Sequence, residues 1–166
     1  MNKKFLVLSA LAGFFFLSRC NEEEATGIDK ELFDEATASA GFSYYINTPA
    51  ITPSSPQSAH NAYMRVRFNS VAQSALDNVT GELPAGASFP NGSMIVKELY
   101  DSPTEPVVLY AIMKKDSSNA NAGANWLWAE IKPDRSVAFP ATKKGSSCTG
   151  CHSMNSRDYT RIFDIF

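Results

Sequence analysis

The clearest strand signal in this chain is the stretch SMIVKELY at residues 93–100. Its apolar side chains are β-branched or large, and it follows a segment rich in proline and glycine at residues 83–92. Large apolar residues that begin directly after turn-forming residues are typical of a β-strand. We therefore predict a strand over residues 93–100 and take it as the centre of the fold.

Similar stretches lie on both sides of this strand. They are AYMRVRFN at 62–69, VVLYAIMK at 107–114, WLWAEI at 126–131 and RSVAF at 135–139. Loops rich in proline and small polar residues separate them, and helical patterns are confined to short segments at 31–40 and 70–78. Five strands with few helices predict an α+β fold, a mainly antiparallel β-sheet with flanking short helices.

The length and composition fit a single folded domain. The chain has 166 residues, of which 44% are hydrophobic and 19% charged, and this excludes wholesale disorder. The first 19 residues look removable and leave 147. They contain three of the 15 basic residues and no acidic one, so 12 basic and 17 acidic side chains remain, a net charge of −5. This balance argues against nucleic acid as a partner.

Residues 1–19 resemble a secretory signal peptide. A basic start precedes an uncharged apolar run at residues 5–17, which is too short to span a bilayer. The sequence LSRC at 17–20 resembles a bacterial lipobox, in which the cysteine becomes the first mature residue and carries lipid. We expect lipidation of Cys20, although Arg19 replaces the small residue usual before that cysteine. The alternative is cleavage nearby that leaves Cys20 as a free thiol.

An acidic segment follows Cys20. It reads NEEE at residues 21–24 and continues with small and acidic residues. We expect residues 20–30 to form a solvated tether that holds the domain at residues 31–166 away from a membrane. The acidic run also resembles a surface-export signal of bacterial lipoproteins. The sequence therefore predicts an exported bacterial lipoprotein in the periplasm or on the outer membrane, with surface exposure as a further expectation.

Near the C-terminus the chain carries CTGCH at residues 148–152, the C-x-x-C-H signature of covalent c-type haem attachment. Two thiols three positions apart lie on one turn, where each can add to a haem vinyl group, and the adjacent imidazole can reach the iron. We therefore expect one covalently bound haem c. Cys148 and Cys151 are the expected attachment sites, and His152 is the expected proximal iron ligand.

Other uses of the cysteine pair fit the sequence less well. A thioredoxin-like redox pair would lie near the start of a βαβ unit, whereas this pair lies close to the end of a strand-rich chain. A zinc site needs a fourth ligand, and the only other histidine is His60. A simple disulfide leaves His152 unexplained.

The position of the motif narrows the type of cytochrome. Small electron carriers attach haem near the N-terminus and bring a methionine ligand from far downstream, but only 14 residues follow His152. Met154 is two residues away and cannot reach the opposite face of the haem. Helical-bundle cytochromes need long amphipathic helices, which this sequence lacks.

The segment around the first strand resembles a known family. Residues 89–99, FPNGSMIVKEL, look like the F-P-x-G-S/T-x-x-V-K-E segment of cytochrome P460. Further matches are Asn-Trp at 125–126, Phe-Pro at 139–140 and Asp-Tyr at 158–159, and the resemblance covers residues 63–166. The order and spacing of these pieces make the resemblance specific.

The resemblance implies an antiparallel sheet with flanking helices in a protein that is often a dimer. It also implies a haem iron that is held by one histidine, with the coordination site opposite this histidine open or exchangeable. In enzymes of the family a lysine amine is bonded to the porphyrin and hydroxylamine is oxidised, commonly with nitric oxide to nitrous oxide. That lysine falls on Lys97, which is the candidate catalytic and cross-linking residue. Relatives called cytochrome c-prime-beta lack the link and bind nitric oxide. The implied partners are a small nitrogen compound, a redox partner cytochrome and a second copy of the chain.

The residues around Lys97 are consistent with this role. On a strand, Lys97 shares a face with Ile95 and Leu99, while Glu98 points to the other face. A lysine between apolar neighbours on a buried face is partly desolvated, which favours the neutral, nucleophilic amine. The alternative from spacing alone is a surface lysine paired across the sheet.

One departure from the family concerns proton transfer. The enzymes use an acidic side chain from the strand just before the haem segment, but the matching stretch at 136–139, SVAF, offers no carboxylate. Hydroxylamine oxidation is therefore left open. Arg65 or Arg67 could place one positive charge near the site or could face solvent. His60 is expected to be a surface or capping residue, and Trp126 is expected to pack in the core.

The sequence thus predicts a monohaem c-type cytochrome of the P460 type that acts on hydroxylamine, nitric oxide or both at an open iron site. A first alternative is a non-enzymatic protein that binds nitric oxide. A second is an electron-transfer cytochrome with Met64, Met94 or Met113 as sixth ligand. A third is a structural surface lipoprotein without cofactor.

Overall fold

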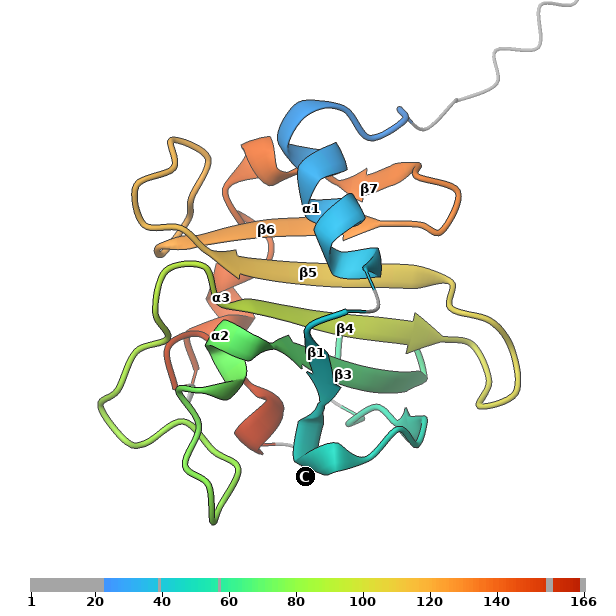
Figure 1. The fold of residues 1–166 in the computed structure, drawn as a ribbon. Helices are drawn as coiled ribbons and strands as arrows, with labels where there is room; N and C mark the ends of the chain where they lie inside the picture. Colours follow the sequence, from blue (N-terminus) through green and yellow to red (C-terminus); the bar gives the residue numbers. More distant parts are fainter. Residues whose placement is uncertain (1–22, 39, 57, 155–156, 165–166) are drawn as a thin grey trace, which may run out of the picture.

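The structure is a computed structural model that describes residues 23–38, 40–56, 58–154 and 157–164. One antiparallel sheet dominates it, in the order β1-β3-β4-β5-β6-β7, with β2 also paired to β3. The strands are β1 Phe42–Tyr44, β2 Thr52–Pro53, β3 Tyr63–Asn69, β4 Met94–Tyr100, β5 Leu109–Lys115, β6 Trp126–Ile131 and β7 Val137–Phe139. The helices are α1 Gly27–Thr37, α2 Ser70–Gln73 and α3 Thr149–His152, with 3-10 turns η1 Tyr45–Asn47, η2 Ala141–Lys143 and η3 Ile162–Asp164. The predicted α+β fold is confirmed (Figure 1).

Strand β4 lies in the middle of the sheet. Lys97 is opposite Val66 of β3 on one side and opposite Ala111 of β5 on the other. Every residue of β4 is buried except Lys97, which is partly buried. Directly opposite residues of paired strands point to the same face, so these pairings decide which side chains accompany Lys97.

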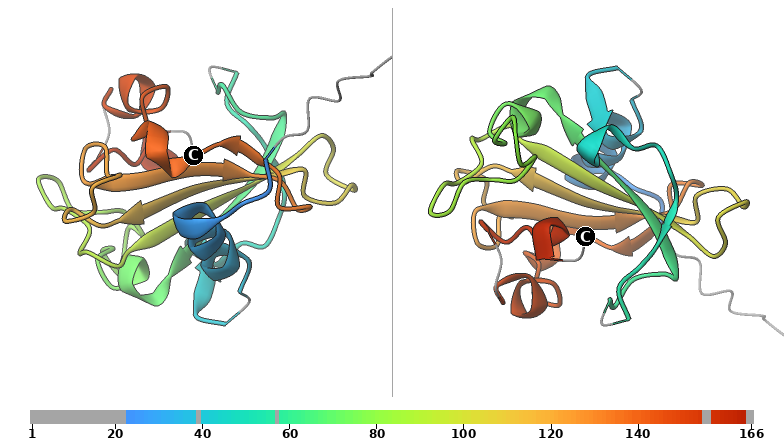
Figure 2. Two further views of the ribbon diagram at one scale, coloured as in Figure 1. Left: turned by 90° about the horizontal axis from the view of Figure 1, so that it is seen from above. Right: turned by 90° about the horizontal axis from the view of Figure 1, so that it is seen from below.

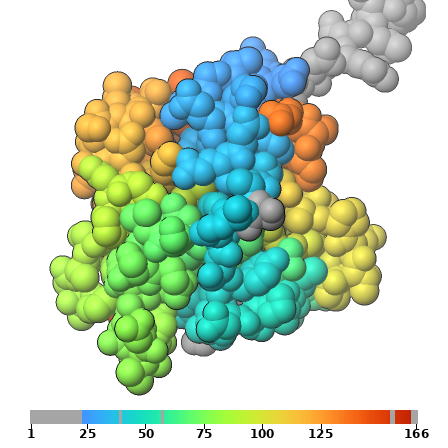
Figure 3. All heavy atoms as spheres, in the orientation of Figure 1, coloured from blue at the N-terminus to red at the C-terminus, as the bar shows by residue number. Residues whose placement is uncertain are grey.

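The alternation of side chains on β4 divides the interior into two cores, one on each face of the sheet. Met94 and Val96 pack with Leu32 of α1, while Ile95 and Leu99 belong to the core on the opposite face. That second core also contains the buried aromatic residues Phe89, Trp126 and Trp128. Figure 2 shows α1 on one face and the C-terminal segment with α3 and η3 on the other. The segment that follows α1 helps to cover the α1 face (Figure 3).

A buried charge cluster lies on the α1 face. The carboxylate of Glu98 pairs with Arg65 at 2.6 Å and with Arg67 at 2.8 Å, and it accepts a hydrogen bond from the Tyr100 hydroxyl at 2.9 Å. Arg67 also donates to the Ala36 carbonyl in α1 at 2.7 Å. The suggestion that one of these arginines reaches the site is wrong, because both share the face of Glu98 rather than that of Lys97. Arg67 does not face solvent either, since it is buried.

The folded part begins before residue 31. Helix α1 starts at Gly27 instead of 31, and the Ala25 N–H donates to the Arg135 carbonyl at 2.8 Å. Within α1, the Asp29 carboxylate accepts from the Ala141 N–H at 2.8 Å. The predicted tether at 20–30 is therefore too long at its C-terminal end, because contacts with residues distant in the chain hold that part on the domain.

Two further differences concern short elements and the N-terminus. Strands β1 and β2 have three and two residues, too few to show a period in the sequence, and pairing with β3 holds them in place. Residues 1–22, with the predicted signal peptide and Cys20, lie outside the described residues. In the part of the chain that the structure describes, no helix has the length and apolar character needed to cross a membrane.

Candidate functional site

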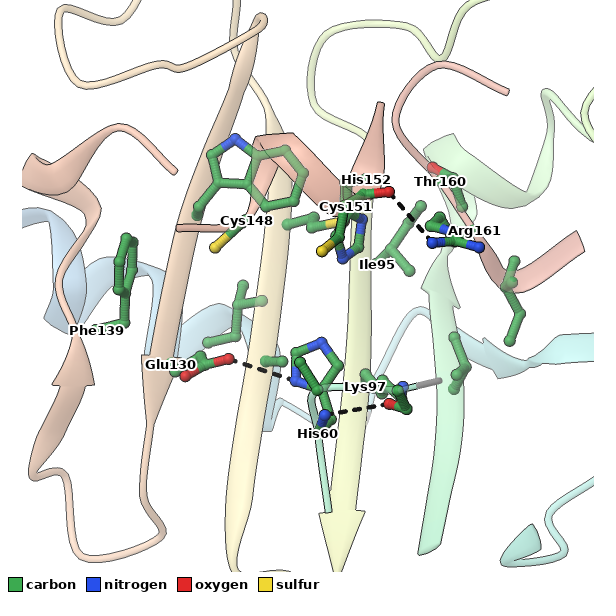
Figure 4. Close-up of a pocket in the computed structure, with 18 of the residues that line it drawn as sticks. His60, Ile95, Lys97, Glu130, Phe139, Cys148, Cys151, His152, Thr160 and Arg161 are labelled. Atoms are coloured by element: carbon green, nitrogen blue, oxygen red, sulfur yellow. Dashed lines mark hydrogen bonds and ion pairs between the residues drawn. The ribbon is translucent and has the colours of Figure 1, made fainter. Parts of the chain in front are cut away.

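A cavity of about 360 Å³ lies on the face of the sheet opposite α1. Its floor comes from strands β3 to β6, which contribute Val66, Ile95, Lys97 and Trp128. Its other walls come from the loop between β2 and β3 and from the segment that carries α3. Figure 4 shows Cys148, Cys151 and His152 along one side of this cavity and His60, Lys97 and Glu130 along the other.

Helix α3 brings the two thiols and the imidazole of the haem motif to one wall. Gly145 begins this turn, and its carbonyl accepts from the N–H groups of Cys148 and Thr149 at 2.8 and 2.9 Å. Gly145 has φ +63°, and a Cβ there would lie 2.5 Å from the Trp128 indole, so only glycine fits. The local sequence thus folds the motif directly against the floor of the cavity.

The two cysteines are free thiols. Cys148 is half-buried and Cys151 is exposed. Burial, assisted by the charge of Glu130, raises the pKa of the Cys148 thiol to about 11. At neutral pH Cys148 is therefore protonated, which suits addition of S–H across a double bond and disfavours thiolate redox chemistry.

The ring of His152 is held in one orientation. Its Nδ1–H donates to the backbone carbonyl of Tyr159 at 2.8 Å, which leaves Nε2 with a free lone pair. The edge of the Trp128 indole also contacts the ring, with centroids 5.0 Å apart. Burial lowers the pKa of His152, so the imidazole is neutral at physiological pH. This is the tautomer and charge state of a metal-binding histidine.

A buried ion pair fixes the segment that supplies the Tyr159 carbonyl. Lys115 Nζ lies 2.6 Å from the Asp158 carboxylate, and both side chains are less than a tenth exposed. The same carboxylate accepts from the Phe89 N–H at 2.8 Å, and the Trp126 indole N–H donates to the Asp158 carbonyl at 3.1 Å. The Asp-Tyr pair noted in the sequence therefore orients the imidazole of His152, a role that its spacing did not reveal.

The amine of Lys97 lies in the cavity, as its strand position predicted. Desolvation by burial lowers its pKa to about 8. Among the described residues no acidic or polar side chain pairs with it. The surface-lysine alternative is wrong, because Lys97 borders the cavity together with Ile95.

The sequence reasoning missed His60 and Glu130. Glu130 lies opposite Ala111, which lies opposite Lys97, so all three share a face and Glu130 borders the cavity. His60 also borders the cavity, with Nδ1 3.4 Å from the Glu130 carboxylate and its ring centroid 6.5 Å from that of His152. The expectation of a surface or capping His60 is therefore wrong, and the carboxylate that the stretch at 136–139 lacks is supplied to the cavity by Glu130 of β6. Strand pairing deduced from the sequence could have placed Glu130 on the face of Lys97. The position of His60 beside Glu130 depends on the conformation of a loop, which the sequence pattern does not give.

Other predicted residues divide between the cavity and the cores. Met113 borders the cavity, whereas Met64 and Met94 are buried elsewhere, Met94 in the α1 core. The arginine that does border the cavity is Arg161, which donates to the Cys151 carbonyl at 3.3 Å. Trp126 is fully buried, as predicted.

This donor set fits a covalently attached haem. Two thiols and an imidazole with a free Nε2 share one wall, and much of the remaining lining is apolar. No curated protein matches the chain significantly. The family model described as cytochrome P460 matches residues 43–162, which is most of the chain. Its sequence, sheet and cavity therefore make this chain a member of the cytochrome P460 family, as its motifs predicted.

Proposed function

We propose that this protein is a monohaem c-type cytochrome that acts on small nitrogen species, hydroxylamine, nitric oxide or both, at the haem iron. Membership of the cytochrome P460 family makes it a haem protein. The observation that carries the finer proposal is that Cys148, Cys151 and His152 border the same cavity as the desolvated amine of Lys97.

Three residues would hold the haem. Each thiol of Cys148 and Cys151 would add across one vinyl group, which exchanges the S–H bond and the vinyl π bond for an S–C and a C–H bond and needs no oxidant. The free Nε2 of His152 would bind the iron, while the Tyr159 carbonyl accepts the Nδ1 proton in a hydrogen bond. When bound, the haem supplies an iron that exchanges electrons with small ligands.

Lys97 is the candidate for the lysine bond to the porphyrin, which would replace an amine hydrogen and a porphyrin hydrogen and pass two electrons and two protons to an oxidant such as dioxygen or peroxide. Its pKa of about 8 leaves a fraction of the amine neutral near neutral pH, and only the neutral amine is nucleophilic. No competing hydrogen-bond partner among the described residues holds its lone pair. This supports a role for Lys97 in the family chemistry.

Oxidation of hydroxylamine releases protons and electrons. Glu130 and His60 border the cavity and can accept protons, so Glu130 is a candidate for the acid that the stretch at 136–139 lacks. The electrons would leave to a redox partner cytochrome. These residues favour the enzymatic form of the proposal.

The apolar lining favours a second candidate, binding of nitric oxide without turnover. Val66, Ile95 and Met113 surround the space beside the polar groups, and such a lining holds a small uncharged ligand without supplying protons. Electron transfer is a third candidate, because Met113 borders the cavity and its sulfur can bind iron.

The location of the protein is also a proposal. We infer export through residues 1–19 and attachment of lipid at Cys20, which would put the haem domain in the periplasm or on the outer membrane. Covalent attachment of haem c requires the same compartment. We also propose a homodimer, because proteins of the cytochrome P460 family are often dimeric.

The experiment uses protein matured in a host that attaches haem c. An optical spectrum and mass analysis of haem peptides are recorded for wild type, Lys97→Leu and the exposed control Lys143→Leu. We expect haem on a peptide with Cys148 and Cys151, joined to a peptide with Lys97 in wild type and in the control only.

Turnover of hydroxylamine with an electron acceptor and titration with nitric oxide then separate the candidates. Turnover supports the enzyme, and a spectral change with nitric oxide alone supports the binding protein. Colourless protein, or iron that responds to neither compound, would refute the proposal.

A further inference from the structure

The ring of His60 lies across the cavity from that of His152 (Figure 4). The two ring centroids are 6.5 Å apart, and the ring planes cross at 78°. His60 comes from the loop between β2 and β3, whereas His152 ends α3, so two distant parts of the chain bring the imidazoles together. Neither the family motifs nor the haem signature accounts for His60.

The separation matches two imidazoles that share one metal ion. Bonds from histidine nitrogen to a metal are about 2.0–2.1 Å, and with half of each ring added the centroids of two axial ligands lie about 6–6.5 Å apart. Rings that cross at a large angle meet this requirement as well as parallel rings do. The same distance also falls within the range of an edge-to-face contact between two rings, so the ligation of a metal has to be tested against simple ring contact.

Each ring has an oxygen near its Nδ1. Tyr159 accepts from His152 Nδ1 at 2.8 Å, and the Glu130 carboxylate lies 3.4 Å from His60 Nδ1. A carbonyl or carboxylate on the second ring nitrogen is the usual partner of a metal-binding histidine, because it sets the tautomer and raises the basicity of Nε2. The hydrogen bond of His152 leaves its Nε2 lone pair available to a metal, and the Glu130 carboxylate is near enough to His60 Nδ1 to favour the same tautomer there.

We propose that His60 is the second axial ligand of the haem iron, on the side opposite His152, and that Glu130 positions it. The inference rests on the haem site of the proposed function and changes its resting state, because a small ligand must first displace His60. The bond is suited to exchange: His60 lies in a loop, its side chain is 23% exposed, and Glu130 holds the ring through one long contact.

The consequence is a lower apparent affinity for small ligands. If His60 leaves the iron for about 1–10% of the time, the apparent dissociation constant of an added ligand rises about 10- to 100-fold. Removal of the imidazole removes this penalty. Glu130→Gln removes the carboxylate and is expected to shift the affinity in the same direction by about 10-fold.

The test is spectroscopic and uses the haem-loaded protein. Ferric wild type, His60→Leu, Glu130→Gln and Asn61→Ala are compared by electron paramagnetic resonance and near-infrared magnetic circular dichroism. Asn61 is the matched control, because it is the next residue of the same loop and its side chain bonds Asp101 outside the cavity. We expect low-spin iron with two histidine ligands in wild type and Asn61→Ala, and high-spin iron in His60→Leu.

Binding of carbon monoxide to the ferrous proteins is the second readout. In wild type we expect an observed rate that saturates with carbon monoxide concentration, because dissociation of His60 comes first, and a linear dependence in His60→Leu. High-spin wild-type iron, or low-spin iron that persists in His60→Leu, would overturn the inference. If His60→Leu does not mature, the dichroism of wild type alone decides between histidine, methionine and amine ligands.

The outcomes for the two proposals differ. High-spin wild type that binds nitric oxide refutes the His60 ligand and leaves the proposed function intact. Low-spin, bis-histidine iron that ignores nitric oxide and hydroxylamine even in His60→Leu supports the ligand and refutes the function.

Discussion

At the scale of single residues, Lys97 is the side chain whose chemistry depends most on its surroundings. Its strand position sends the amine into the cavity with Ile95, and burial lowers its pKa to about 8. The charged form is therefore destabilised in the folded chain, which is unusual for a lysine. A residue kept at such a cost is a candidate for function.

This cost can be measured in the haem-free chain. Between the folded pKa of about 8 and the ordinary value of 10.5, the unfolded chain binds more protons at this position, so Lys97 makes the free energy of unfolding rise with pH. Below pH 8 the penalty is complete and is on the order of 3 kcal/mol. Lys97→Met should therefore be more stable than wild type at pH 7, and this difference should shrink as the pH approaches 10.5.

Urea unfolding at several pH values gives the measurement. The difference between wild type and variant isolates Lys97 from other groups that titrate in the same range, such as Cys148. Lys143→Met, at an exposed position, should show a difference within about 0.5 kcal/mol at every pH. A difference for Lys97→Met that does not vary with pH would contradict a desolvated amine.

At the scale of elements, the pair of Lys115 and Asp158 joins the end of β5 to the segment after α3. The carboxylate also binds the Phe89 N–H, and the backbone of Asp158 accepts from Trp126. The next residue supplies the carbonyl that holds His152. One buried pair thus connects the sheet, the turn before β4 and the orientation of the proximal histidine.

Asp158→Ala should be strongly destabilising, because it leaves Lys115 as an uncompensated buried charge. We expect a loss of about 3–5 kcal/mol in the free energy of unfolding, measured by urea denaturation. Asp34→Ala is the control, since the exposed carboxylate of Asp34 also pairs with basic side chains and should cost no more than about 1 kcal/mol. Equal losses in the two variants would mean that burial of the pair adds nothing.

At the scale of the whole molecule, the proposed leader and lipid would decide where the domain works. Cys20 follows a lipobox-like sequence, and a lipid on its thiol would hold the haem domain at a membrane. The described domain begins within a few residues of this cysteine, since Ala25 is already buried. A lipid on Cys20 would therefore leave only a short tether, and the domain would lie close to the bilayer surface.

Cys20→Ala should abolish incorporation of labelled fatty acid and release the protein from the membrane fraction. Metabolic labelling followed by fractionation of the producing cells measures both effects. Arg19→Ala is the control, because it restores a small residue before the cysteine and should keep the lipid. Fatty acid that remains on Cys20→Ala would show that another residue carries the anchor.

Local sequence patterns were enough to predict most of the fold and part of the candidate site. A strand such as β4 is visible in the sequence because a run of large apolar residues directly after turn-forming residues is a local property, and the haem motif is visible because its thiols must lie on one turn. The placement of Lys97 on a buried face followed from the alternation of side chains along the strand. The short strands β1 and β2 were not visible, because only pairing with β3 makes them strands.

The sequence by itself determined the central strand, the family and the residues able to hold a haem, since each of these depends on short-range spacing. Only the tertiary structure decided which groups surround that haem site. Strand register places Glu130 on the same face of the sheet as Lys97. The conformation of a loop places the ring of His60 across the cavity from that of His152. A buried ion pair holds the segment whose Tyr159 carbonyl accepts the hydrogen bond from His152. These contacts join residues far apart in the chain, and their free energy depends on distances that no local pattern encodes.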